Sequence, residues 1–123
     1  MNIPMLHSKI HRATVTEADL HYHGSITIDR RLMDLADLLP HQHVHVYNIT
    51  NGARFETYVI EGERNSGSIK INGAAAHLAG TGNLIIIAAY IHMPRNEALC
   101  WQPNIIFVDD ENRPLSGERQ AAE

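Results

Sequence analysis

Residues 44–60 read VHVYNITNGARFETYVI, and this stretch says most about the fold. Two runs rich in β-branched and aromatic residues, 44–50 and 53–60, flank the dipeptide Asn51-Gly52. Asn-Gly between two such runs is the strongest short-range signal for a β-hairpin, because both residues tolerate the positive φ angles of a tight turn. The stretch therefore predicts two antiparallel strands joined at residues 51 and 52.

A two-residue loop also predicts which residues oppose each other across the hairpin. It pairs Tyr47 with Glu56 and His45 with Tyr58. Side chains alternate between the two faces of a strand. One face is then mostly apolar, with Val44, Val46, Phe55, Thr57 and Val59, and the other carries Tyr47, Arg54, Glu56 and Tyr58. A cation and a phenol on one face could hold an anionic substrate, although the same pattern is typical of a solvated surface.

The rest of the chain is also dominated by strand signals. A helix is expected after Asp29, a good N-cap residue, and it should end at Pro40. Many short strands with one or two short helices are typical of a small β-barrel, so we expect a mainly β fold in a single domain. The further strands are expected at residues 6–15, 25–28, 68–72, 84–90 and 104–108, followed by a loose polar tail at 109–123.

Composition excludes several classes of protein. The chain has 123 residues, enough for one domain, and a formal net charge of −4 without a basic stripe, so no nucleic-acid partner is expected. Cys100 is the only cysteine, which rules out an intrachain disulfide. The N-terminus lacks the apolar run of a signal peptide, and the apolar run 84–91 is too short to span a membrane. A cytoplasmic protein without a membrane partner is expected.

Nine histidines raise the possibility of a metal site. His43 and His45 are two residues apart, so a strand would place both side chains on one face, as in cupin-like metal sites. No matching carboxylate or third histidine is evident further along the chain. Surface histidines are therefore the favoured interpretation and no metal site is predicted, with metal binding kept as an alternative.

Ser25 could in principle be the nucleophile of a hydrolase. However, Gly24-Ser25 is not part of a Gly-x-Ser-x-Gly turn between a strand and a helix, so a hydrolase triad is not indicated.

Several short blocks together resemble the aspartate 1-decarboxylase family. They match in order and spacing over roughly residues 5 to 108 without a gap, which is far more specific than any single motif. The blocks are Met5-Leu6, 9–16 (KIHRATVT), 18–20 (ADL), Tyr22, Gly24-Ser25, Ile28-Asp29, Asn51-Gly52, Arg54-Phe55, Thr57-Tyr58 and 72–77 (NGAAAH).

The resemblance implies a double-psi β-barrel, a homotetramer, and a cofactor made from the chain itself. In this family the bond between Gly24 and Ser25 would break autocatalytically, leaving residues 1–24 and a second chain, 25–123, that begins with a pyruvoyl group. The pyruvoyl group would form a Schiff base with L-aspartate, which loses CO2 to give β-alanine for pantothenate and coenzyme A. Some relatives need a helper protein for this maturation.

The resemblance also implies roles for individual residues. Tyr58 matches the proton donor of turnover, and Thr57 the donor to the oxyanion formed during cleavage. Arg54 and Lys9 match the residues that hold the substrate carboxylate. The other matched pocket positions are His11, Tyr22, Tyr47, Asn72, Gly73, Ala74 and Ala75. Ile26 and Tyr47 depart from the cysteine and tryptophan that many members have there.

Two alternatives remain beside the enzyme. One is a non-catalytic barrel of the same fold that stays uncleaved at Ser25 and acts as a binding module. The other is a metal-binding, cupin-like protein that uses His43 and His45.

Overall fold

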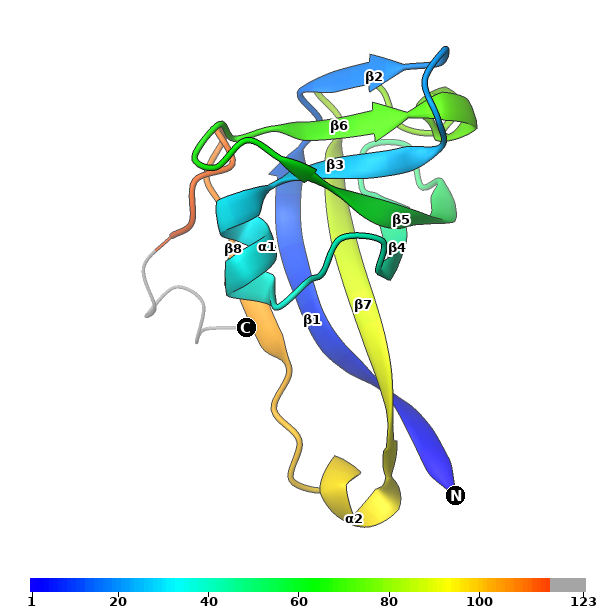
Figure 1. Ribbon diagram of the computed structural model, residues 1–123, viewed down its shortest axis with the longest axis vertical. Helices are drawn as coiled ribbons and strands as arrows, with labels where there is room; N and C mark the ends of the chain where they lie inside the picture. Colours follow the sequence, from blue (N-terminus) through cyan, green and yellow to red (C-terminus); the bar gives the residue numbers. More distant parts are fainter. Residues whose placement is uncertain (116–123) are drawn as a thin grey trace.

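Eight strands form one mixed sheet that curls into a small β-barrel (Figure 1). The computed structural model describes residues 1–115. The strands lie side by side in the order β2-β6-β3-β5-β4-β7-β1-β8. Their bounds are β1 Asn2–Thr14, β2 Glu17–Asp19, β3 Ser25–Asp29, β4 His43–Asn48, β5 Arg54–Gly62, β6 Ile69–Asn72, β7 Leu84–Pro94 and β8 Asn104–Phe107; the helices are α1 Arg30–Ala36, the 3-10 helix η1 Gly73–His77 and α2 Arg95–Ala98.

The core is an apolar row that crosses the barrel from strand to strand. Ile10 of β1 pairs with Ile87 of β7, which pairs with Val46 of β4, which in turn pairs with Phe55 of β5. The first three of these side chains are at most 1% exposed. Residues that oppose one another directly point to the same face, so the residues between them along each strand point outward. The expected mainly β small barrel with short helices is confirmed.

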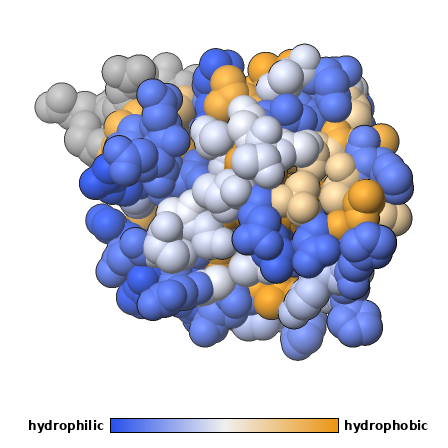
Figure 2. Space-filling model, turned by 90° about the horizontal axis from the view of Figure 1, so that it is seen from above, coloured by the Kyte–Doolittle hydropathy of each residue, from blue (hydrophilic) through white to orange (hydrophobic). Residues whose placement is uncertain are grey.

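The strands β1 and β7 are longer than the barrel needs. Their paired ends extend away from it as an arm that carries α2 near its tip (Figure 1). Apolar side chains are exposed there, with Tyr90 at 42%, Ile91 at 39% and Leu99 at 73%. By contrast, the face in Figure 2 is largely hydrophilic, with smaller apolar areas between polar ones.

The predicted hairpin is present, but its register was wrong by two residues. His45 opposes Glu56 and Tyr47 opposes Arg54. The reason is Asn48, whose Oδ1 accepts from the N–H of Thr50 at 2.9 Å while its carbonyl oxygen accepts from the N–H of Gly52 at 2.8 Å. These bonds stabilise a wider turn over residues 49–52. A shift of two residues preserves the faces, so the predicted division into an apolar and a polar face is correct.

Helix α1 begins as predicted and ends earlier. The carboxylate of Asp29 accepts from the N–H of Arg31 at 2.8 Å, which is the expected N-cap. The helix ends at Ala36 because Asp37 adopts a left-handed conformation with φ 55°, so the prediction that Pro40 ends it was wrong.

The segment after β8 is bound to the barrel up to the last described residue, which corrects the prediction of a loose tail for residues 109–115. Asn112 is 1% exposed. Its amide donates to the carbonyl oxygens of Thr14 and Gly67, both at 2.8 Å, and accepts from the N–H of Thr14 at 2.7 Å. Residues 116–123, the remainder of that predicted tail, lie outside the described residues. Among residues 1–115, none of the helices has the length and apolar character needed to cross a membrane.

We expect Asn112→Ala to destabilise the protein by about 2–4 kcal/mol, because it leaves three backbone groups of the barrel without their hydrogen-bond partner. Urea unfolding at fixed protein concentration measures this. Glu111→Ala is the matched control, since its side chain is exposed, and should change stability little. Equal stability of both variants would mean that this segment does not support the barrel.

Candidate active site

The Ser25 side chain is buried at the start of β3 and held by two hydrogen bonds. It is 0% exposed. Its Oγ donates to the carbonyl oxygen of His23 at 3.3 Å and accepts from Nδ2 of Asn72 at 2.9 Å. Asn72 directly opposes Ser25 in the β3–β6 pairing, and its Nδ2 also donates to Thr27 Oγ1 at 3.1 Å. The hydroxyl oxygen is therefore fixed beside the peptide bond that precedes it.

Gly24 packs directly against Gly73 at the beginning of η1. A Cβ atom on Gly73 would lie 2.7 Å from Gly24 Cα and 3.0 Å from the carbonyl oxygen of Tyr22, and Gly73 has a φ of +73°. Only glycine fits this position without strain. The beginning of η1 therefore lies against the backbone of residues 22–24, directly before Ser25. A Cβ on Gly24 itself would meet nothing within 4 Å, so that side of Gly24 Cα is open.

Tyr58 and Thr57 lie near the same end of β3. The parallel pairing of β3 with β5 matches Ile26 with Val59, so the residues just before each of them are also neighbours. Val59 points into the core, hence Tyr58 points outward, where it is 37% exposed and its ring stacks with that of His41 at 6.4 Å. Thr57, one residue earlier, points to the side of Val44, its cross-strand partner.

Arg54 belongs to a different group of side chains. Its guanidinium carbon lies 4.3 Å from the ring centre of Tyr47, a cation–π contact. The Tyr47 hydroxyl is hydrogen-bonded to that of Tyr90 at 2.6 Å. Partial burial, together with this bond to Tyr47, raises the pKa of Tyr90 to about 12, so its phenol stays protonated at neutral pH.

Lys9 lies on the same outer face of the sheet as Arg54. Directly opposed residues in a sheet share a face. Lys9 opposes Ala88 on β7, and Ala88 opposes His45 on β4. His45 in turn opposes Glu56, which is on the same face of β5 as Arg54. His11 follows on β1 with its ring edge against Phe107 at 5.3 Å. Tyr22 lies before Ser25, and the Lys70 ammonium sits 4.8 Å above the centre of its ring.

Within one chain the expected site residues thus form two groups. The first surrounds the Gly24–Ser25 bond and includes Asn72, Gly73 and, on the neighbouring strand, Tyr58. The second lies on the outer face with Arg54, Tyr47 and Lys9. Arg54 is four residues from Tyr58 along an extended strand, about 13 Å between Cα atoms.

Sequence reasoning missed three groups that contact these residues. Thr27 shares the face of Ser25, so strand alternation alone could have identified it. The carbonyl oxygen of His23 and the phenol of Tyr90 had no such signal, because their contacts depend on the turn before β3 and on the pairing of β4 with β7.

Comparison with known proteins identifies the family. The family model described as aspartate decarboxylase matches residues 1–115. A protein of Thermoanaerobacter pseudethanolicus named aspartate 1-decarboxylase is 59% identical over 112 residues, which cover 91% of this chain and 96% of the relative. Proteins of the same name from Syntrophus aciditrophicus and Syntrophotalea carbinolica are 58% and 54% identical, covering 89% and 94% of this chain and 94% and 88% of the relatives. The buried Ser25 with its two hydrogen bonds therefore lies in a chain that belongs to the aspartate decarboxylase family.

Proposed function

We propose that this protein converts L-aspartate to β-alanine and CO2 on a pyruvoyl group formed from Ser25, and that the product feeds pantothenate and coenzyme A synthesis. The observation that carries the proposal is the buried Ser25 hydroxyl, fixed by Asn72 and the His23 carbonyl next to Gly24. Family membership and the names of the relatives agree with it.

The side chains around Ser25 suit self-cleavage. Ser25 Oγ attacks the carbonyl carbon of Gly24, the bond from that carbon to the Ser25 nitrogen breaks, and an ester replaces the peptide. Loss of the Ser25 Cα proton and departure of the Gly24 carboxylate then leave a dehydroalanine, which water converts to a ketone and ammonia. Thr57 is the proposed hydrogen-bond donor to the oxyanion of the first step.

The pyruvoyl group supplies an electron sink for decarboxylation. The remaining work belongs to the side chains. Tyr58, outward-facing beside Ser25, is the proposed proton donor to the substrate carbon. Arg54 can hold a carboxylate through both arms of its guanidinium, and stacking on Tyr47 restricts its orientation. Lys9 adds a second cation on that face.

We further propose that each site combines two chains of a homotetramer. The guanidinium of Arg54 lies over the Tyr47 ring on the outer face of the sheet. Arg54 is about 13 Å along β5 from Tyr58, which is beside Ser25, so we infer that the Arg54 guanidinium does not reach Ser25 of the same chain. A neighbouring copy that packs on this face would supply Arg54, Tyr47 and Lys9 to the Ser25 group. The exposed apolar side chains of the β1–β7 arm are suitable contacts for such packing.

Self-cleavage is tested by intact mass under denaturing conditions. The wild-type chain should give one fragment that ends at Gly24 and another that begins with pyruvoyl, whereas Ser25→Ala should stay whole. Ser8→Ala, which removes another fully buried strand serine, is the control and should cleave. The proposal fails if the wild-type chain stays intact, even when co-expressed with candidate helper proteins.

Shared sites are tested by complementation. Arg54→Ala should lower kcat/KM by roughly 30- to 1000-fold while cleavage proceeds, because no substrate is present during maturation. Tyr58→Phe should also mature but release little β-alanine. Co-expressed, the two variants should recover about one quarter of wild-type activity, since about one site in four then receives an intact Tyr58 from one chain and an intact Arg54 from its neighbour.

Two outcomes would contradict this arrangement. No recovery in mixed oligomers would place Arg54 and Tyr58 of each site on the same chain. Wild-type kinetics for Arg54→Ala would remove Arg54 from the site. Arg54→Lys is the matched variant. It keeps the positive charge but cannot bind a carboxylate through two parallel hydrogen bonds, so its activity should lie between those of Arg54→Ala and the wild type.

A further inference from the structure

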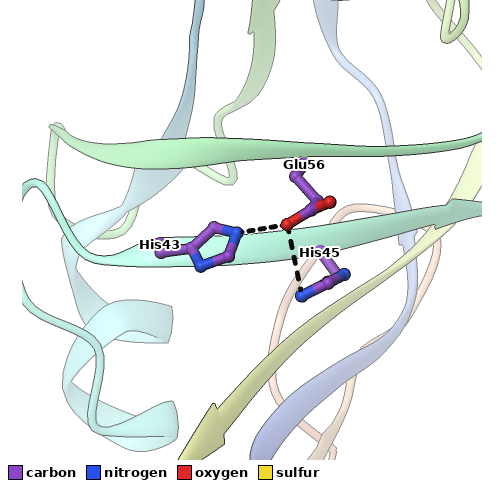
Figure 3. Close-up of side chains that lie close together, drawn as sticks. All are labelled: His43, His45 and Glu56. Carbon is purple, nitrogen blue, oxygen red and sulfur yellow. Dashed lines mark hydrogen bonds and ion pairs between the residues drawn. The ribbon is translucent and has the colours of Figure 1, made fainter.

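Two histidines and a carboxylate converge on the polar face of the β4–β5 hairpin. His43 and His45 project from β4, and Glu56 projects from β5 toward both of them (Figure 3). Nε2 of His43 lies 2.7 Å from Glu56 Oε1, and Nε2 of His45 lies 3.7 Å from the same oxygen. Potential ligand atoms of all three side chains lie within 4.8 Å of one another. The proposed decarboxylation assigns no role to these residues.

The strands fix this arrangement. His45 and Glu56 are direct cross-strand partners, and His43 is two residues earlier on the same face. Both strands lie inside the sheet, since β4 also pairs with β7 and β5 also pairs with β3. Ligands on paired strands of a sheet are placed more accurately than ligands on loops.

The distances suit a metal ion after small side-chain adjustments. Zn²⁺ binds histidine nitrogen and carboxylate oxygen at about 2.0–2.2 Å, so tetrahedral ligand atoms are about 3.3 Å apart. The two separations between a histidine nitrogen and the Glu56 oxygen, 2.7 and 3.7 Å, lie on either side of that value. Two nitrogens and one carboxylate favour an ion such as Zn²⁺, Co²⁺ or Ni²⁺ over Mg²⁺ or Ca²⁺, which prefer oxygen ligands.

We propose that His43, His45 and Glu56 bind one divalent transition-metal ion of the Zn²⁺ class per chain. The ion replaces the direct contact between the Nε2 atoms and Glu56 Oε1, and any proton on a ligating nitrogen is released to solvent. In the single chain the site is open, because an accessible cavity of about 520 Å³ is lined by His43, His45, Tyr47 and Tyr90. Water can therefore complete the coordination in the single chain.

A solvated ion pair is the competing explanation for the cluster. A protonated His43 beside the Glu56 carboxylate would be an ordinary cross-strand pair worth little to stability. That explanation needs only one histidine and predicts no saturable metal binding. Metal binding is favoured because the second histidine, His45, also approaches the same oxygen of Glu56.

Calorimetric titration of the full-length protein with Zn²⁺, in the absence of chelators, tests the site. We expect one Zn²⁺ per chain, and Co²⁺ in its place should give visible absorption bands typical of protein-bound cobalt. His43→Ala and His45→Ala should each weaken binding by roughly tenfold or more, since even residues that only support a ligand have effects of that size. Glu56→Gln should also weaken it.

His21→Ala is the matched control, because it removes an exposed histidine on the segment after β2, outside the cluster, and should bind Zn²⁺ like wild type. Circular dichroism checks that each variant is folded. Absence of saturable Zn²⁺ binding by the wild-type chain would overturn the proposal. Wild-type affinity in a folded His43→Ala/His45→Ala double variant, or equally tight binding of Mg²⁺, would overturn it as well.

Discussion

The placement of β3 between β5 and β6 is the constraint on which the candidate site depends. Antiparallel pairing with β6 puts Asn72 opposite Ser25, and parallel pairing with β5 puts Tyr58 beside it. The next residue of β3, Ile26, opposes Ile71 on β6 and Val59 on β5. All three side chains are fully buried, so the hydrophobic core fixes the register of both pairings. A slip of one residue would turn Ser25 into the core and Ile26 out of it. Core packing and site geometry are therefore set by the same contacts.

Local patterns predicted the elements better than their connections. The apolar alternation of β4 and β5 gave the right faces, and Asp29 was rightly identified as an N-cap, because both depend on neighbouring residues. The hairpin register depended instead on Asn48, whose side chain and carbonyl oxygen organise a wider turn than Asn51-Gly52 alone suggests. The end of the chain was misjudged for a similar reason: a polar segment becomes part of the barrel when one amide, Asn112, pairs with backbone groups distant in sequence.

The carboxylate partner of the histidines is visible only in the fold. No metal site was predicted because no matching carboxylate or third histidine was evident further along the chain. The observed register puts Glu56 opposite His45 and supplies that partner. The candidate residues around Ser25 came from the family resemblance, whereas their contacts, such as Asn72 with Ser25 and Arg54 with Tyr47, required the fold because they join strands distant in sequence.

The outer face of β5 carries opposing charges close together, which affects how an anionic substrate would approach it. Arg54, Glu56 and Tyr58 alternate along the strand and point to the same side. A free Glu56 carboxylate would repel an anion that Arg54 attracts, and near a protein surface such an interaction is only partly screened. Contact with His43 and His45 offsets that charge when an imidazole is protonated, and a bound dication would offset it more completely. The histidine cluster and the proposed carboxylate-binding residue are therefore linked electrostatically through Glu56, although they use different side chains.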